Sequence, residues 1–274
     1  MVSMSKKEST AFKLSQNRLW IQAGFLLVWL DPLALRLHNI CGPVLHCYAC
    51  PLATFACPIG VLANFAALHI FPFAAIGTLV LVGAVFGRFI CGFVCPFGLL
   101  QDLASRTPGP KITVPVYFSY ARYFVLAALV FAIPYLYSME HPLSICMVCP
   151  VSGIEAAIPN MLSQASQSKS IVWPNMIKII LTLAVIVSMF FVHRVWCYLC
   201  PLGAIFGLFN KFSLFIYKIG PSCTNCGACS KSCKMNLSPA KAPGSDSCIR
   251  CLDCADCKTG AIEIATPLTA KDLI

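Results

Sequence analysis

Eight cysteines near the end of the chain fall into two closely spaced runs. The cysteines of the first run are separated by two, two and three residues, and those of the second run by two, two and two: Cys223, Cys226, Cys229, Cys233; Cys248, Cys251, Cys254, Cys257. Short C-x-x-C steps turn consecutive thiolates toward one iron–sulfur cube, and the fourth cysteine of each run reaches the other cube. The spacing therefore predicts two [4Fe–4S] clusters, one held by Cys223, Cys226, Cys229 and Cys257 and the other by Cys248, Cys251, Cys254 and Cys233.

Zinc is the alternative occupant, because paired C-x-x-C elements also bind zinc. It fits less well, since a zinc ribbon has two pairs of cysteines and each run here has three closely spaced thiolates plus a fourth. The region 222–266 resembles two-cluster bacterial ferredoxins, and 260–264 resembles their short closing strand. Two departures concern the fourth ligands: Lys234 and Lys258 stand where the family usually has proline, and the second run is one residue short before Cys257.

The composition predicts a membrane protein with a small soluble module. Hydrophobic residues make up 58% of the 274 residues and charged residues 11%, against about 25% charged residues in a soluble domain. The 18 cysteines cluster in short-spaced units, which favours metal ligation or redox work over structural disulfides. Much of the net charge of +10 flanks apolar segments, so the positive-inside rule explains it and we expect no nucleic-acid partner.

Four apolar segments are near the ~20 residues needed to cross a bilayer: 19–35, 73–90, 117–137 and 176–196. The apolar segment 51–71 contains Pro51 and Pro58, is followed by Pro72, and includes Asn64 and His69. We interpret it as a re-entrant or interfacial helix, with a fifth span as the alternative; its counterpart, 150–162, is too short to cross. The predicted fold class is thus membrane all-α, with about four transmembrane helices in an internal two-fold repeat with short half-helices, plus the ferredoxin module.

The positions of lysine and arginine predict the orientation. They are frequent in the N-terminal arm, between Arg88 and Arg122, and after Arg194, and sparse in the other connections. We therefore expect a multi-pass protein of a bacterial or archaeal cytoplasmic membrane with both termini in the cytoplasm. The predicted domains are a basic arm (1–18), a membrane domain (19–217, with halves 19–110 and 111–217) and a cytoplasmic ferredoxin domain (218–274).

The two halves repeat a cysteine–proline pattern. Each half has a cysteine pair before a proline at each end of its second span, and proline suits the first turn of a helix. The helix N-terminus then stabilises the thiolate. Topology predicts two four-thiolate sites, an inner one of Cys91, Cys95, Cys197 and Cys200 and an outer one of Cys47, Cys50, Cys146 and Cys149, with Cys41 and Cys57 as spare or substitute ligands. Structural buried cysteines and a thiol–disulfide relay are the alternatives.

These membrane motifs carry a second resemblance. Arg88-x-x-Cys91-x-x-x-Cys95-Pro96, the turn Trp196-Cys197-x-x-Cys200-Pro201-x-Gly203 and the terminal ferredoxin module resemble the membrane quinol dehydrogenase subunit of periplasmic nitrate reductase systems (NapH type). That wider polyferredoxin-like family includes nitrous oxide reductase regulators and cytochrome oxidase assembly proteins. Here the second inner motif is one residue shorter, and the outer cysteines are additional to those the nitrate-system subunit generally has.

The preferred function is single-electron transfer between cytoplasmic [4Fe–4S] clusters, one or two further clusters in the membrane domain, and a quinone or an outer-face redox partner in a multi-subunit complex. The chain would be an electron-transfer or quinol dehydrogenase subunit; no catalytic residue is predicted. The alternatives are an assembly factor that reduces a metal for another enzyme, and a transmembrane thiol relay. Five residues near the outer ends of the spans are candidates for quinone or proton chemistry, with Glu140 and His141 preferred over Asp31, His46 and His69.

Overall fold

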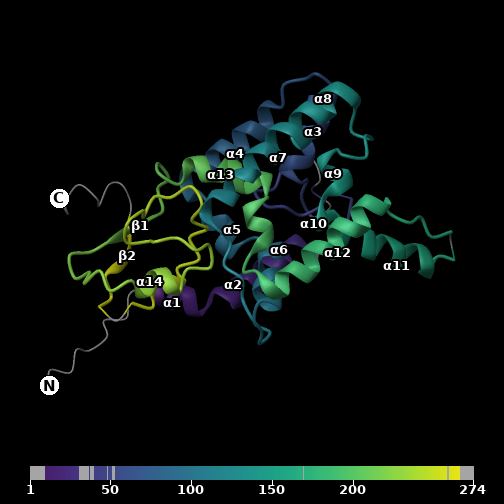
Figure 1. The fold of residues 1–274 in the computed structure, drawn as a ribbon. Helices are drawn as coiled ribbons and strands as arrows, with labels where there is room; N and C mark the ends of the chain where they lie inside the picture. The colour runs from purple at the N-terminus through teal and green to yellow at the C-terminus, as the bar shows by residue number, and fades with distance from the viewer. Residues whose placement is uncertain are drawn as a thin grey trace.

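The computed structural model describes residues 10–30, 37, 40–47, 49–50, 53–168, 170–257 and 259–265. Asp31, Pro51, Lys169 and Lys258 lie outside the described residues. Figure 1 shows two parts, a large helical part and a smaller part that contains the two strands and the cysteine runs.

The helical part is built from short helices joined by tight turns. Before the midpoint of the chain these are α1 (Thr10–Gln16), α2 (Arg18–Trp29), α3 (Pro58–Ala67), α4 (Phe73–Phe86), α5 (Phe89–Phe93), α6 (Pro96–Ala104), η1 (Val116–Tyr120), α7 (Ala121–Val125) and η2 (Leu126–Ala132). After it come α8 (Ile133–Tyr137), α9 (Ile145–Val148), α10 (Pro150–Ser152), η3 (Gly153–Ala157), α11 (Ile158–Ser166), α12 (Met176–Phe191), η4 (Val195–Tyr198) and α13 (Pro201–Phe209).

Of the four predicted spans, one contains a helix long and apolar enough to cross a membrane. This is the continuous 22-residue helix Val116–Tyr137, which runs from η1 to α8. The other three predicted spans contain shorter apolar helices in the described part of the chain: α2, α4 and α12. The four-span arrangement therefore stays a prediction.

The internal repeat is visible as a repeated unit of helix, turn and helix. In the first half α4 is followed by α5 and by α6, which begins at Pro96; in the second half α12 is followed by η4 and by α13, which begins at Pro201. The segment 51–71, which we interpret as a re-entrant or interfacial helix, contains α3, and this helix begins at Pro58. Its counterpart runs without a break through α10, η3 and α11.

The ferredoxin part is held by a two-stranded antiparallel sheet. β1 (Ile216–Ile219) pairs with β2 (Ile262–Ala265), with Ile216 opposite Ala265. The short helices α14 (Ala228–Lys231) and η5 (Asp253–Ala255) lie within the cysteine runs. Helix α1, which belongs to the predicted N-terminal arm, packs against β2 and η5, so this arm is partly helical and contacts the module.

One hydrophobic core runs through both parts. It includes Phe93, Phe97 and Tyr198 of the helical part together with Met235 and Ile249 of the ferredoxin part. The module is therefore packed against the helical part, and its position relative to the cysteines of the helical part is fixed by that packing.

Candidate functional site

The first group of module cysteines lies at the exposed end of the ferredoxin part. Four thiols surround one small cavity: Cys223, Cys226, Cys229 and Cys257. Cys223 and Cys226 are exposed. This is the set that the spacing predicted for one cluster, and its role as a ligand set stays a prediction.

The second group lies between the first group and the helical part. Cys233, Cys248, Cys251 and Cys254 line one cavity together with Tyr217 of β1, again the combination that the spacing predicted. The thiol of Cys254 is within electrostatic reach of Cys229 in the first group. The two groups are therefore neighbours.

The third group joins the two halves of the repeat. Cys91 and Cys95 come from the first half and Cys197 and Cys200 from the second, and the four thiols interact electrostatically with one another. Cys95 and Cys200 each precede the proline that begins a helix, and the Cys200 sulfur accepts a hydrogen bond from the backbone N–H of Gly203 at 3.4 Å. The structure thus brings together the predicted inner set.

Two arginines cross between the halves at this group. Arg88 precedes Cys91 by three residues and donates from Nη2 to the carbonyl of Cys197 at 3.2 Å. Arg194 precedes Cys197 by three residues and donates from Nη1 to the carbonyl of Cys91 at 2.8 Å. Both arginines are fully buried, and Arg88 faces the thiols of Cys91, Cys197 and Cys200. They provide buried positive charge where negatively charged thiolates would be placed.

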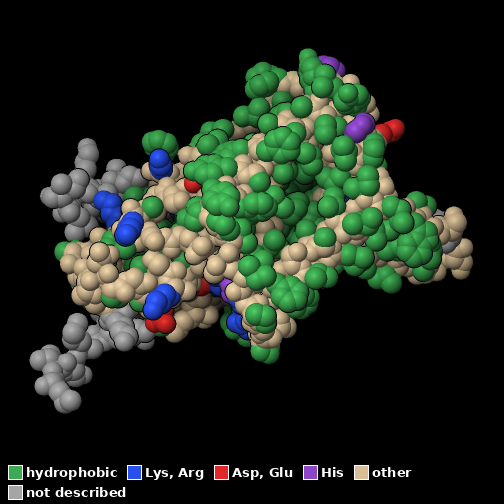
Figure 2. All heavy atoms as spheres, in the orientation of Figure 1, with side chains coloured by type: hydrophobic (Ala, Val, Ile, Leu, Met, Phe, Trp, Pro, Cys, Tyr) green, Lys and Arg blue, Asp and Glu red, His purple; other side chains and the backbone are tan. Residues whose placement is uncertain are grey.

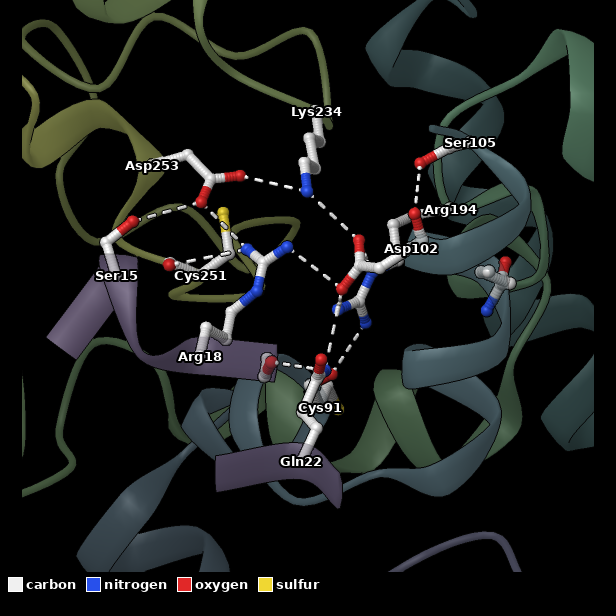
Figure 3. A network of polar contacts seen from close by, with 12 residues as sticks. Ser15, Arg18, Gln22, Cys91, Asp102, Ser105, Arg194, Lys234, Cys251 and Asp253 are labelled. Carbon is white, nitrogen blue, oxygen red and sulfur yellow. Dashed lines mark hydrogen bonds and ion pairs between the residues drawn. The ribbon is translucent and has the colours of Figure 1, made fainter. Parts of the chain in front are cut away.

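A buried ion-pair network connects this group to the module (Figure 3). Asp102 of α6 pairs with Arg194, with Arg18 at 2.9 Å and with Lys234 at 3.0 Å. Arg18 and Lys234 also pair with Asp253 of the module, at 2.9 Å and 3.2 Å. Burial by itself would raise the pKa of Asp102, but the charges of Arg194, Lys234 and Arg18 outweigh it and hold this pKa well below the usual range. The Asp102 carboxylate is therefore ionised at neutral pH.

The second and third groups share side chains. Tyr198 is within electrostatic reach of Cys233 in the second group and of Cys197 in the third. The backbones of the two groups are also in close contact at Gly92. A Cβ placed on this glycine would lie 2.6 Å from the carbonyl oxygen of Ile249. Only glycine permits this approach, which places the Cys91 turn directly against the Cys248–Cys251 loop.

The fourth group differs from its prediction in one member. A cavity of about 210 Å³ is lined by Cys47, Cys57, Cys146 and Cys149. Cys50, the predicted fourth member, does not line this cavity and instead lies beside the imidazole of His46. Cys57, predicted as a spare or substitute ligand, takes its place; Cys41 belongs to none of the four groups.

The predicted quinone or proton residues lie apart from this cavity, with one exception. Glu140 and His141 do not line it; the His141 ring packs on Tyr137, at 5.0 Å between centroids. His69 packs on Tyr135. His46 lines the cavity, and its Nδ1 lies 2.9 Å from the Glu155 carboxylate.

Four residues that shape these groups were missed by sequence reasoning: Asp102, Glu155, Lys178 and Tyr198. They carried no local signal, because their partners lie far away in the sequence. Cys57 was predicted as a spare or substitute ligand, and it precedes Pro58 as Cys149 precedes Pro150.

Three of the groups have the number of thiols that a [4Fe–4S] cluster takes as ligands. In each of them four cysteines line one cavity. Within the part of the chain that the structure describes, no three His, Cys, Asp or Glu side chains are arranged to hold a metal ion.

Comparison with known protein families supports an iron–sulfur protein. Residues 68–115 and 174–220 each match the 4Fe–4S binding domain family. The two segments contain the four cysteines of the third group, and they stop short of the cysteines of the fourth group.

Several curated proteins are similar over much of the chain. An uncharacterized protein of Methanocaldococcus jannaschii is 26% identical over 70% of this chain and 78% of its own length. Protein NirI of Paracoccus denitrificans is 31% identical over 60% of this chain and 24% of NirI. The putative electron transport protein YccM of Escherichia coli is 22% identical over 66% of this chain and 49% of YccM. No solved structure matches. Taken with the domain match, these similarities support an iron–sulfur protein that functions in electron transfer.

Proposed function

We propose that this chain is a multi-pass protein of the cytoplasmic membrane that passes single electrons between the two module clusters and a cluster held between its halves, and onward to a quinone or an outer-face redox partner. The observation that carries the proposal is the order of the thiol groups. The first group neighbours the second through Cys229 and Cys254, and the second neighbours the third through Tyr198. Such a series suits stepwise electron transfer.

The surface of the helical part supports a membrane location. Large apolar side chains are exposed along the long helix and on α12, among them Phe124 (70%), Leu136 (68%) and Ile180 (62%). Figure 2 shows hydrophobic side chains covering much of the helical part, whereas most of the charged side chains in view lie toward the module. A continuous apolar surface of this kind marks contact with lipid or another protein.

The chain's own residues hold and tune the clusters. When bound, a [4Fe–4S] cluster accepts and releases one electron at a time. Arg88 and Arg194 stabilise negative charge at the third group, and the N–H groups of the helices that begin at Pro96 and Pro201 point toward it. The hydrogen bonds of both arginines to cysteine carbonyls fix the two halves in one register.

Two aspects of the proposal rest on similarity. The name of YccM describes it as a putative electron transport protein, and that of a further relative, MauN, as ferredoxin-type. The second aspect is a quinol dehydrogenase role within a multi-subunit complex, which is based on the resemblance of the motifs to the NapH type. The orientation with both termini in the cytoplasm rests instead on the distribution of lysine and arginine.

The test is electron transfer through the purified chain in liposomes. A strong reductant is added outside vesicles in which the module faces outward, and a quinone analogue serves as acceptor. Cys95→Ala should leave the module clusters present and reducible but slow reduction of the quinone at least tenfold, whereas Cys41→Ala, outside every thiol group, should leave the rate unchanged. Equal rates for Cys95→Ala and the wild type would contradict the proposal.

A further inference from the structure

The cavity of the fourth group is lined by cysteines that lie outside the segments matched by the 4Fe–4S binding domain family. It is lined by four thiols from three separate segments, Cys47, Cys57, Cys146 and Cys149, while the matched segments are 68–115 and 174–220. Its four thiols are mutually within electrostatic reach. Four thiols that converge on a cavity of about 210 Å³ are arranged to bind a ligand.

Cys57 takes the same local structure as two other cysteines that precede proline, one in its own group and one in the third group. It has φ −68° and ψ 122° before Pro58, compared with −67° and 121° for Cys149 and −68° and 119° for Cys95. The sulfur of Cys57 faces the backbone N–H of Gly60, as that of Cys149 faces Ser152 and that of Cys95 faces Gly98. Cys57 is therefore the structural equivalent of a ligand of the third group.

A cation accompanies the four thiols here, as Arg88 does at the third group. Lys178 of α12 lines the same cavity, and its Nζ donates to Ser152 Oγ at 3.0 Å. It is within electrostatic reach of Cys47 and Cys146. A thiolate-ligated cluster carries negative charge, so a lysine facing it stabilises the bound form.

Cys50 is excluded from this site by its packing. It is 2% exposed and forms a separate small cluster with Ala53 and Ala156, with Cys47 packed against it. The position of Cys57 is supported from the other side. Its neighbour Ala56 donates to the carbonyl of Ile40 and accepts from Gly42, both at 2.9 Å.

We propose that Cys47, Cys57, Cys146 and Cys149 hold a fourth [4Fe–4S] cluster, with Lys178 as its neighbouring cation. The proposal rests on the proposed iron–sulfur function but not on the direction of electron flow. Trp196 and Pro201 line this cavity, and the residues next to them, Cys197 and Cys200, belong to the third group. One electron can thus move between the third and fourth clusters, oxidising one as the other is reduced.

The first experiment counts iron and acid-labile sulfide in the purified full chain after anaerobic reconstitution, together with electron paramagnetic resonance spectra. The wild type should hold about sixteen irons, four for each cluster. Cys57→Ala and Cys149→Ala should each lose about four irons and the same one signal. Cys50→Ala, the matched control, should lose neither. Retention of the module signals shows that each variant is folded.

Three results would overturn the proposal. The first is loss of iron in Cys50→Ala with full retention in Cys57→Ala. The second is a wild type in which mass spectrometry without reduction finds Cys57 joined to Cys149 or Cys146 in a disulfide. The third is binding of a quinone analogue in the cavity of a chain that holds about twelve irons. Loss of iron from Cys57→Ala but not from Cys95→Ala would instead contradict the inner site of the proposed function and leave the fourth cluster standing.

The second experiment tests Lys178 by the potential of the fourth cluster. Lys178→Met removes a positive charge beside the cluster, so the reduced form is less favoured and its midpoint potential should fall, while the potential of the third cluster should stay unchanged. Lys178→Arg keeps the positive charge, so its midpoint potential should stay close to that of the wild type. An unchanged potential in Lys178→Met would show that Lys178 does not face the cluster.

Discussion

Arg88 and Arg194 each reach from one half of the repeat into the other. Each guanidinium passes over a glycine that lies three residues after the proline-preceding cysteine of the opposite half: a Cβ on Gly203 would lie 2.8 Å from Arg88 Nη2, and one on Gly98 would lie 2.5 Å from Arg194 Nη1. A side chain at either glycine would therefore displace an arginine from the third group.

Gly203→Ala should disturb the third cluster by displacing Arg88. Overpacking of this kind costs about 1–3 kcal/mol, and the displaced charge should change the spectrum and lower the potential of the third cluster. The measurement is a redox titration followed by electron paramagnetic resonance. Gly77→Ala is the control, because a Cβ there meets nothing within 4 Å. An unaltered signal in Gly203→Ala would show that Arg88 does not act on this cluster.

Asp102 is the residue on which three cations converge. Its carboxylate is 2% exposed and pairs with Arg18, Arg194 and Lys234. Asp102→Asn keeps the size of the side chain but leaves these cations without their anion, which should lower the free energy of unfolding by about 3 kcal/mol. Thermal melting of the detergent-solubilised protein measures this loss. Glu263→Gln, on an exposed position of β2, is the control and should melt like the wild type.

The stabilisation from Asp102 depends on pH in a defined direction. Its pKa in the folded protein is held well below the usual value by Arg194, Lys234 and Arg18, despite burial. A lowered pKa contributes stability above the pKa of the unfolded chain, about 4, and this contribution is lost as the pH falls toward the folded value. The difference in melting temperature between the wild type and Asp102→Asn should stay constant from about pH 8 to pH 5 and narrow below about pH 4. A difference that widens on acidification would contradict this assignment.

At the scale of elements, four helices begin in the same way, with a cysteine followed by a proline. Three of these starts, at Cys95, Cys149 and Cys200, follow from the sequence, because each stands in a short cysteine pair before a proline. The fourth could not be chosen by pattern, since the segment 46–60 contains two Cys-Pro steps. The structure decides it through tertiary hydrogen bonds: Thr54 donates to the carbonyl of Val28 at 2.7 Å, and α3 begins four residues later, at Pro58.

Two helices, α4 and α12, end earlier than the predicted spans that contain them, because turns interrupt them. Two predicted spans extended to residues 90 and 196, because further apolar residues follow Arg88 and Arg194. Helix α4 ends at Phe86, where Gly87 takes a φ of +54°, and α12 ends at Phe191, before Arg194 takes the same left-handed φ of 54°. Hydropathy includes the apolar residues beyond each helix end but does not reveal these turns. The turns direct Arg88 and Arg194 toward the opposite half of the repeat.

At the scale of the whole molecule, the sequence predicts a separate module, and the structure shows it docked. The local spacing of cysteines was enough to group the thiols of the first two sites. The docking depends on buried polar contacts between distant residues, such as Arg122 with Asp246 at 2.7 Å and Ser119 with Ser247 at 2.7 Å. No local pattern marks such pairs, so the distance from module to third group could not be predicted.

Asn210 joins the module to the turn that carries Arg88, beside the third group. It is 1% exposed; its Oδ1 accepts from the backbone N–H of Arg88 at 2.9 Å, and its Nδ2 donates to the carbonyls of Ser245 and Cys248 at 2.9 Å and 2.8 Å. Asn210→Ala would leave these backbone groups without their partner, at a cost of about 2 kcal/mol. The loop that carries Cys248 should then loosen from the Arg88 turn.

This loosening should slow electron transfer without removing clusters. In Asn210→Ala we expect the full iron content, faster proteolytic cleavage near β1, and slower one-electron transfer from the module to the third cluster after rapid reduction. Asn64→Ala, at an exposed position of α3, should match the wild type in all three measurements. If Asn210→Ala keeps both the wild-type transfer rate and its resistance to protease, the packed core alone holds the module in place, because Phe93, Tyr198 and Ile249 remain buried together.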